Sequence, residues 1–368
     1  MNNELFITHI KIHKLRHLKD IEIALSKNER VHLILTGKNG SGKTSLLWAI
    51  RDLFIKYETP LSAIKNHNIS VKFNILDDLT LSQNHQFILS FFAAKRGTSM
   101  DMPQGPHKIN LEKHYKINVD TPSHTLLQYL VNLKVEQSFA RDDDDLETVE
   151  KIKTWFLMFE NMLRELFADE TLKLQFDRKN YNFYFITKGR EPFDFNTLAD
   201  GYSAVVSILS DLIIRMAQTE SYDMPGIVLI DEIEIHLHVE LQKKILPFLT
   251  HFFPKIQFIV STHSPFVLTS LKGAVIYDLE SQAQFEDLSA YAYDAVVERY
   301  FEVDKYSAVI KEKVKEYEYL RDLSIKTPEE QLKLLALKNY LNKIPSDFAP
   351  ELVAHFQSLE LREIAKNG

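Results

Sequence analysis

The stretch Gly37-Lys38-Asn39-Gly40-Ser41-Gly42-Lys43-Thr44 decides the fold, because its spacing satisfies the pattern G-x-x-x-x-G-K-[ST]. The residues before it, VHLIL at 31–35, form a short apolar run that predicts a buried strand. The residues after it repeat apolar side chains at helical spacing. Glycine is scarce, with 10 in the whole chain, so the glycine cluster between residues 37 and 42 is a local excess. The sequence therefore predicts a strand, a glycine-rich loop and a helix in succession.

Such a loop binds phosphate, and a chance glycine turn is the competing interpretation. Glycines allow backbone N–H groups to surround phosphate oxygens, and a helix N-terminus favours negative charge. Lys43 would reach the β- and γ-phosphate oxygens, and Thr44 would offer its hydroxyl to Mg²⁺. We therefore expect phosphate binding at this loop, with Mg²⁺ as the accompanying cation. The expected nucleotide-binding residues of the loop are Gly37, Asn39, Gly40, Ser41, Gly42, Lys43 and Thr44.

Two further apolar runs end in polar side chains. GIVLI at 226–230 is followed by Asp231 and Glu232, and KIQFIVST at 255–262 is followed by His263. Strand ends are where α/β sheets bind ligands. We expect Asp231 to hold Mg²⁺ together with Thr44, and Glu232 to polarise the water that attacks the γ-phosphate. His263 could donate a hydrogen bond to that phosphate. The competing interpretations are two acids that cap a helix and a structural histidine. The expected catalytic residues are Lys43, Glu232 and His263.

Patterning along the chain predicts an α/β fold with a mixed sheet flanked by helices. Strands are expected at 5–15, 20–25, 31–35 and 87–94, a helical hairpin at 123–141 and 146–167, a β-hairpin at 172–176 and 181–186, and a helix at 203–217. Four aspartates, 142–145, separate the two arms of the helical hairpin. They end one helix and cap the next, because a calcium loop of the EF-hand type would need a glutamate where Lys153 stands.

These patterns divide the chain into four parts. Residues 1–102 would form the N-terminal part of a phosphate-binding α/β head, 103–168 a loop and helical hairpin insert, 169–285 the C-terminal part of the head, and 286–368 a helical extension. The extension is almost wholly helical in pattern, and Thr327-Pro-Glu-Glu330 is typical of a helix start.

Composition narrows the class of protein. The chain has 368 residues, and 44 Lys and Arg against 51 Asp and Glu give a formal net charge of −7, which argues against blanket binding of nucleic acid or anionic membrane. Because there is no cysteine, disulfides, cysteine-ligated metal and thiol nucleophiles are excluded. No signal-peptide pattern and no apolar run long enough for a membrane span are visible. We therefore expect a cytoplasmic protein with no membrane role.

The motifs GKNGSGKT, LIDEIEIHLH and STHSP together resemble the ABC-type ATPase heads of the RecF, SMC and OLD-nuclease group, over most of residues 1–285. The resemblance implies that two heads pair head to tail around ATP, with a signature loop of one closing on the nucleotide of the other. The matching segment here is Leu198-Ala199-Asp200-Gly201-Tyr202. Gly201 would contact the γ-phosphate. Ala199 stands where the family commonly has serine, and Tyr202 where glutamine or glutamate is usual.

The resemblance also assigns residues near the N-terminus and after Glu232. Arg16 and His13 fall where family members often stack on adenine. Glu234, His236 and His238 resemble a loop that passes between protomers, and the alternative is a zinc site built on H-x-H, which lacks an evident third ligand. Lys95 and Arg96 at the end of the 87–94 strand are interpreted as a solvated strand end, with phosphate or nucleic-acid sensing as the alternative.

The function that this resemblance implies is a nucleotide-gated switch. The signature-like segment of this chain reads L-x-D-G-Y. In this it resembles the ATPases of Septu-type, retron-associated or PARIS-type antiphage systems. The residues after His263 contain no Asp-x-Asp pair, so a TOPRIM nuclease is not expected within this chain. We expect a homodimer or higher homo-oligomer that regulates a separately encoded HNH or TOPRIM nuclease. The alternative is a RecF/SMC-like DNA-binding ATPase in recombination or repair, with nucleic acid as partner through Lys11, Lys14, Arg16 and Lys19. A transporter subunit is a third alternative.

Overall fold

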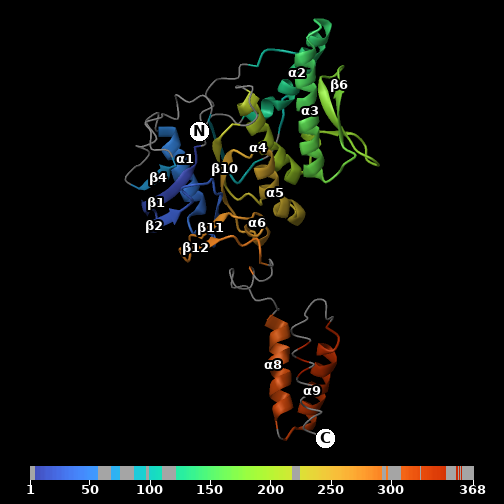
Figure 1. Ribbon diagram of the computed structural model, residues 1–368. Helices are drawn as coiled ribbons and strands as arrows, with labels where there is room; N and C mark the ends of the chain where they lie inside the picture. Colours follow the sequence, from blue (N-terminus) through green and yellow to red (C-terminus); the bar gives the residue numbers. More distant parts are fainter. Residues whose placement is uncertain are drawn as a thin grey trace. The chain divides into compact units, whose positions relative to one another are not determined.

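The computed structural model describes residues 5–56, 68–74, 87–96, 99–109, 122–217, 224–291, 308–323 and 325–344, together with residues 296, 354, 356 and 358 (Figure 1). The chain divides into two compact units, residues 1–292 and 293–368. The first unit holds all the sites expected from the sequence, and each unit is described by itself below.

A six-stranded, mostly parallel sheet forms the centre of the first unit. Its strands run in the order β12-β11-β3-β10-β9-β5, and within it only β12 runs antiparallel to its neighbour. The bounds are β3 Leu33–Thr36, β5 Ile88–Phe92, β9 Gly226–Ile230, β10 Ile256–Ser261, β11 Val275–Asp278 and β12 Ala283–Glu286. Every residue of β3, β9 and β10 is buried, which explains their continuous apolar runs. The predicted mixed sheet is confirmed, although β11 and β12 were not predicted.

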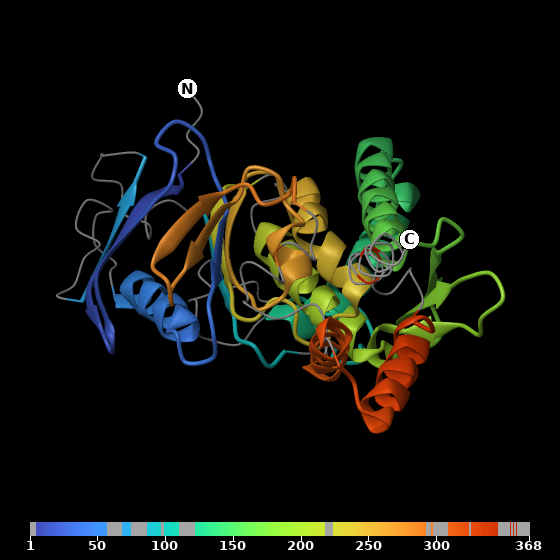
Figure 2. The same ribbon diagram turned by 90° about the horizontal axis from the view of Figure 1, so that it is seen from below.

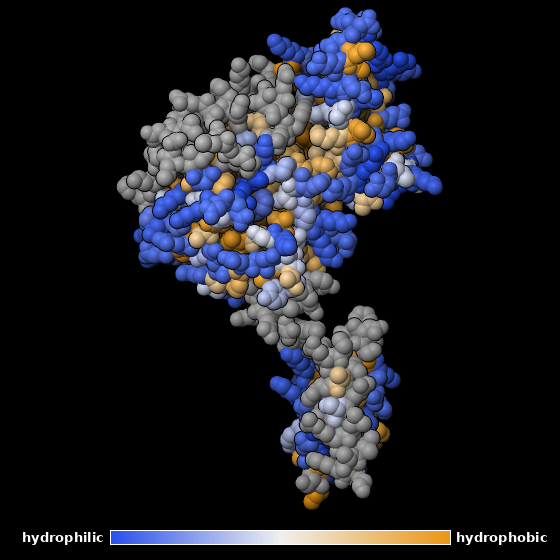
Figure 3. Space-filling model, viewed as in Figure 1, coloured by the Kyte–Doolittle hydropathy of each residue, from blue (hydrophilic) through white to orange (hydrophobic). Residues whose placement is uncertain are grey.

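An antiparallel sheet lies on one side of the parallel sheet, and α1 packs against both sheets (Figures 1 and 2). Its strands are β1 Ile7–Leu15, β2 Leu18–Ala24 and β4 Ile69–Phe73, in the order β2-β1-β4, and α1 spans Lys43–Lys56. Apolar residues of both sheets and of α1 form one core. The opposite face of the antiparallel sheet is hydrophilic, as Figure 3 shows over β1 and β2. Strand β4 was not predicted.

A buried amide joins the two sheets. Gln257 of β10 is fully buried, and its Nε2 donates to the carbonyls of Ile7 at 3.0 Å and Val31 at 2.7 Å. Its Oε1 accepts from the Ile7 N–H at 2.7 Å. Because all three hydrogen bonds are satisfied away from water, Gln257 fixes the position of β1 against β3 and β10.

The other face of the parallel sheet carries helices and the insert. The bounds are α4 Asp200–Ala217, α5 Val239–Phe252 and α6 Pro265–Leu268; the insert contains η2 Pro122–Thr125, α2 Leu126–Asp142 and α3 Leu146–Phe167, followed by β6 Lys173–Asp177, β7 Asn182–Ile186, β8 Phe193–Asp194 and η3 Phe195–Thr197. The predicted helical hairpin and β-hairpin are confirmed. Asp145 caps α3 by accepting from the Thr148 N–H at 3.1 Å, as expected of the aspartate run.

The second unit contains α8 Ala308–Asp322 and α9 Pro328–Leu341, packed through Tyr317, Leu320, Leu337, Leu341 and Phe356. Thr327 and Glu330 form the expected capping box at the start of α9. The sequence placed the start of the helical extension at residue 286, but β12 ends at Glu286 and the second unit begins at residue 293. Within the second unit, α8 and α9 agree with the predicted helical pattern. Among the helices that the structure describes, none is long and apolar enough to cross a bilayer.

Candidate functional site

The parallel strands bring the sequence motifs to one edge of the sheet. The glycine loop follows β3, Asp231 follows β9, and Thr262 and His263 follow β10, and these three strands are neighbours in the order β3-β10-β9. Parallel neighbours end on the same side, so their carboxyl ends gather polar side chains from distant parts of the chain.

The loop at 37–44 needs glycine at its first position for two reasons. Gly37 has φ of 126°, and a Cβ there would lie 2.8 Å from both Asp278 Oδ1 and Ser41 Oγ. An L-residue would therefore be strained in conformation and would also collide with two oxygens. At Gly40, with φ of 84°, a Cβ would meet nothing within 4 Å, so the loop opens outward at that point.

Lys43 is held inside the loop. Its Nζ donates to the carbonyls of Gly37 at 2.7 Å and Lys38 at 3.1 Å, and the residue is 5% exposed. Burial lowers the pKa of Lys43, and the carboxylate of Glu232 most strongly opposes that shift. A desolvated ammonium that is surrounded by loop carbonyls can transfer its hydrogen bonds to phosphate oxygens at small reorganisation cost.

Asp231 joins the loop to the end of β9. Its Oδ1 accepts from Thr44 Oγ1 at 3.2 Å and from Ser261 Oγ at 2.6 Å. The same Ser261 hydroxyl oxygen accepts from the Glu232 N–H at 2.7 Å. The threonine and aspartate that the sequence assigned to Mg²⁺ therefore lie within hydrogen-bonding distance of each other, and Ser261, which was not predicted, orients both acidic residues.

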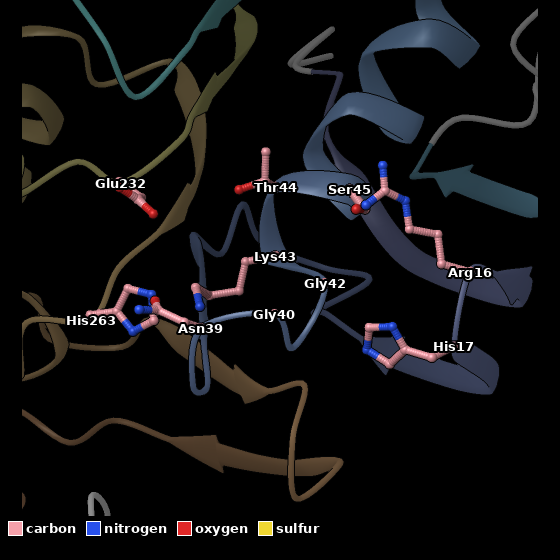
Figure 4. A pocket seen from close by; sticks show the side chains of 10 residues that line it. All are labelled: Arg16, His17, Asn39, Gly40, Gly42, Lys43, Thr44, Ser45, Glu232 and His263. Atoms are coloured by element: carbon pink, nitrogen blue, oxygen red, sulfur yellow. The ribbon is translucent and has the colours of Figure 1, made fainter.

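A cavity lies over the loop, and Figure 4 shows Glu232 and His263 at one end of it and Arg16 and His17 at the other. Its lining residues are Arg16, His17, Asn39, Gly40, Gly42, Lys43, Thr44, Ser45, Glu232 and His263. Arg16 and His17 come from the turn between β1 and β2, where Arg16 has φ of 55°. His13, which was expected beside Arg16, is not among the lining residues.

His17 was missed because it belongs to no motif. Its Nε2 lies 3.1 Å from the Ser41 carbonyl oxygen, so the β1–β2 turn contacts the glycine loop directly. The only signal in the sequence was its position next to Arg16, the residue that the family resemblance selected. The end of the cavity opposite Glu232 is therefore formed by two neighbouring basic side chains.

His263 reaches the cavity from the end of β10, as expected. Burial and the nearby Lys43 ammonium lower the pKa of His263, so the imidazole is neutral at pH 7 and can donate one N–H. Its backbone N–H donates to Glu234 Oε1 at 2.6 Å. Glu234, which was placed in an inter-protomer loop by resemblance, thus fixes the His263 backbone within the same chain.

The sequence interpretation of Lys95 and Arg96 as a solvated strand end holds for Lys95 but not for Arg96. Lys95 is exposed, as a solvated strand end should be, but the Arg96 guanidinium turns inward. It donates to the carbonyls of Ala93 at 3.0 Å, Asp231 at 2.7 Å and Glu232 at 2.8 Å. The interpretation of Arg96 as solvated is wrong because β5 and β9 are parallel neighbours, which brings residue 96 beside the peptide groups that follow β9.

The signature-like segment lies elsewhere in this unit. Gly201 lies in the first turn of α4 and does not line the cavity; a Cβ there would lie 2.7 Å from the His236 carbonyl oxygen. The Tyr202 ring stacks on Phe167 with 4.4 Å between ring centroids. His236 and His238 are exposed, and among the described residues no group of three His, Cys, Asp or Glu could hold a metal ion.

Local chemistry fits a triphosphate with Mg²⁺. Two buried hydroxyl oxygens, Thr36 Oγ1 directly before the loop and Ser41 Oγ within it, make no hydrogen bond with any described residue. The buried Lys43 ammonium supplies positive charge, and the Thr44–Asp231 pair supplies the hard oxygen ligands that Mg²⁺ prefers. The donor set therefore suits phosphate and a hard divalent cation.

Comparison with known families gives a domain match in the middle of the chain. Residues 113–269 match the family described as "AAA domain, putative AbiEii toxin, Type IV TA system". This range contains the hairpin, the signature-like segment, Asp231, Glu232 and His263, but it begins after the glycine loop.

Individual relatives agree with the resemblance inferred from the motifs. The Septu protein PtuA of Bacillus mycoides is 27% identical over 78% of this chain and 42% of its own length. The retron Vc95 probable ATPase of Vibrio cholerae is 44% identical over 25% of this chain and 18% of its own length. The chain thus spans less than half the length of these two relatives. The predicted resemblance to Septu-type and retron-associated ATPases is confirmed.

Among solved structures, an Smc head domain of Pyrococcus furiosus bound to the C-terminal domain of ScpA is 12% identical, with a TM-score of 0.41, over 76% of this chain and 95% of that chain.

Proposed function

We propose that this chain binds ATP with Mg²⁺ and hydrolyses it. The observation that carries the proposal is the 3.2 Å contact between Thr44 Oγ1 and Asp231 Oδ1, with Glu232 on the same cavity. These residues are far apart in sequence, and their meeting at the glycine loop is what nucleotide hydrolysis requires. Similarity to a retron probable ATPase supports the same reaction.

Each residue has one role in the proposed reaction. Lys43 and the loop N–H groups hold the phosphates, and Thr44 and Asp231 would hold Mg²⁺, which neutralises phosphate charge when bound. Glu232 accepts the proton of the water that attacks the γ-phosphorus, while the bond to the ADP oxygen breaks. The neutral His263 donates its N–H toward the γ-phosphate.

Two copies would pair head to tail, so that Gly201 of one copy approaches the nucleotide of the other. This part rests on the family resemblance and on the position of Gly201 outside the cavity of its own chain. The N-terminus of α4 adds N–H donors that favour a phosphate. ATP would then promote pairing, and hydrolysis would release the pair.

The biological role we propose is a switch that controls a separately encoded nuclease of HNH or TOPRIM type in antiphage defence. Similarity to PtuA of the Septu system and to a retron protein supports this context. The DNA-binding alternative has weaker support, because Lys11 is paired with Glu22 at 2.5 Å and Arg16 lines the cavity. Co-purification from the native host tests the role, and recovery of no nuclease would contradict it.

Glu232→Gln is the sharpest test of the chemistry. Loss of the proton acceptor should lower kcat by about 10²- to 10⁴-fold. Binding of ATP and Mg²⁺ should remain, so light scattering should detect an ATP-dependent dimer that persists. Wild-type turnover in this variant would show that Glu232 is not the base, and a monomer at saturating ATP would contradict head-to-tail pairing.

A further inference from the structure

The backbone at Glu232 adopts a conformation that few side-chain-bearing residues accept. Its φ is 46°, in the left-handed region. This conformation costs free energy in residues with a Cβ, and it persists only where surrounding contacts impose it. The proposed base therefore depends on whatever holds its peptide groups.

Both peptide groups that flank the Glu232 Cα are held by side chains, one from the end of β10 and one from the segment that follows β5. On the amino side, the Glu232 N–H donates to Ser261 Oγ at 2.7 Å, and Arg96 Nη1 donates to the Asp231 carbonyl at 2.7 Å. On the carboxyl side, Arg96 Nη2 donates to the Glu232 carbonyl at 2.8 Å. One guanidinium thus spans the two carbonyls on either side of the residue.

The Arg96 side chain is charged although it is partly buried. Burial lowers the pKa of Arg96 to about 10, and the carboxylates of Glu234, Asp231 and Glu232 oppose that shift. A guanidinium with this pKa remains protonated at neutral pH. Charge-assisted hydrogen bonds from a buried cation are stronger than neutral ones, so the two carbonyls are held firmly.

We propose that Arg96 is a positioning residue for ATP hydrolysis: it holds the 231–232 turn so that the Glu232 carboxylate faces the cavity that Thr44 and Lys43 line. This inference rests on the proposed ATPase function. Arg96 itself does not line the cavity, so it acts through Glu232 and leaves nucleotide binding to the glycine loop.

Geometry explains why arginine is required. The planar guanidinium presents two terminal nitrogens in a fixed fork that matches two carbonyl oxygens. A lysine ammonium keeps the charge but is a single point that cannot span both carbonyls with the same orientation. Arg96→Lys therefore removes the two-carbonyl grip while it retains the positive charge.

The first experiment compares steady-state ATP hydrolysis of the 368-residue wild-type chain, Arg96→Lys and Arg96→Gln. We expect kcat to fall about 100-fold in both variants, because misplacement of a catalytic group by about 1 Å costs that much. The Kd for the non-hydrolysable analogue AMP-PNP with Mg²⁺ should change less than about threefold. Arg51→Lys is the matched control, since Arg51 stacks on Trp48 outside the cavity and should keep wild-type kcat.

A double variant separates positioning from general stabilisation. If Arg96 acts only through Glu232, Arg96→Lys should change the slow single-turnover hydrolysis of Glu232→Gln by less than about twofold. An equal loss in both backgrounds would overturn the proposal, and so would wild-type kcat in both Arg96 variants. A wild-type chain that binds ATP but never hydrolyses it would instead contradict the proposed function.

Hydrogen exchange tests, independently of catalysis, whether Arg96 stabilises the backbone around Asp231 and Glu232. In the wild type the Asp231 N–H donates to the Phe92 carbonyl at 2.8 Å and the Ile233 N–H to the Ser261 carbonyl at 3.0 Å. Arg96→Lys should raise exchange of peptides that cover residues 226–237 at least about tenfold, with peptides from α3 unchanged. Unchanged exchange at 226–237 would overturn the proposal even if kcat falls.

Discussion

Two glycine-marked segments of the first unit, 37–44 and 198–202, have opposite surroundings. The first lies at the strand ends, where Asp231, His263 and Glu232 converge on it. The second starts α4, with Gly201 against a backbone carbonyl and Tyr202 on an aromatic ring. The first can act on a nucleotide held by its own chain. The second does not line that cavity, and its proposed action on a nucleotide depends on a second copy.

Among the variants considered, Lys43→Ala should cause the largest loss of ATP affinity. If it caused none, the contrast between segments 37–44 and 198–202 would not hold. The variant removes the only described lysine on the cavity, so the Kd for ATP with Mg²⁺ should rise at least about 100-fold. Isothermal titration calorimetry measures it, with Lys72→Ala on the exposed face of β4 as the matched control. Equal affinity in wild type and Lys43→Ala would mean that the 37–44 loop does not hold the phosphates.

Acidic pH should lower the stability of the strands β3 and β10, which carry the first segment and its neighbours. His32 precedes β3, its Nδ1 accepts from the Phe258 N–H of β10 at 3.1 Å, and burial lowers its pKa to about 4. The unfolded chain binds the proton near pH 6.5, so this contribution to stability is complete above that pH and is lost as the pH falls toward 4. Between pH 7 and pH 5 the loss should be about 2 kcal/mol.

His32→Asn provides the control, because its amide oxygen can accept the same hydrogen bond without titrating. Urea unfolding at pH 7 and pH 5 should show a smaller loss in this variant than in the wild type. The difference isolates His32 from the other histidines. If both proteins lose the same free energy of unfolding, His32 does not tie β3 to β10 as a neutral acceptor.

Gly201→Ala tests the second segment. A Cβ 2.7 Å from the His236 carbonyl forces a shift of α4 or of the 234–237 turn, which should cost about 1 to 2 kcal/mol in the free energy of unfolding. At protein concentrations where the chain is monomeric, affinity for ATP should remain within about threefold, because Gly201 does not line the cavity of its own chain. Gly105→Ala is the matched control, since nothing lies within 4 Å of its Cβ position. A large loss of ATP affinity in monomeric Gly201→Ala would mean that segments 37–44 and 198–202 belong to one nucleotide site within the same chain.

The surroundings of each residue also explain which residues of the site could be predicted from the sequence. Asp231, Glu232 and His263 each follow an apolar run, and the shared edge of parallel strands brings such positions together, so the cavity end beside Lys43 was predictable. Ser261 and Arg96 were not, because they hold the acidic residues through a hydroxyl and backbone carbonyls, and no spacing pattern encodes such contacts. Their partners depend on which strands are neighbours, which the sequence alone did not determine.

The fold shows the same division. Long periodic segments such as α3 and fully apolar strands such as β9 were predicted, since burial leaves a clear pattern in the residues themselves. Strands β4, β11 and β12 were not predicted: β4 and β12 alternate over only five and four residues, and β11, VIYD, is a buried run with only three apolar residues before its aspartate. The left-handed φ of Glu232 is likewise imposed by tertiary contacts rather than by local sequence.

Tyr202 gives the smallest expected effect and the finest test of the second segment. Its ring stacks on Phe167, the last residue of α3, with an interplanar angle of 12°, so the stack connects the start of α4 to the helical hairpin. Tyr202→Phe keeps the ring and should leave stability unchanged, whereas Tyr202→Ala should lose about 1 kcal/mol. In a double-mutant cycle with Phe167→Ala, the coupling energy should be about 0.5 to 1.5 kcal/mol by urea unfolding. A coupling near zero would mean that the hairpin and the signature-like segment are energetically independent, and that Tyr202 merely fills the place that the family gives to a polar residue.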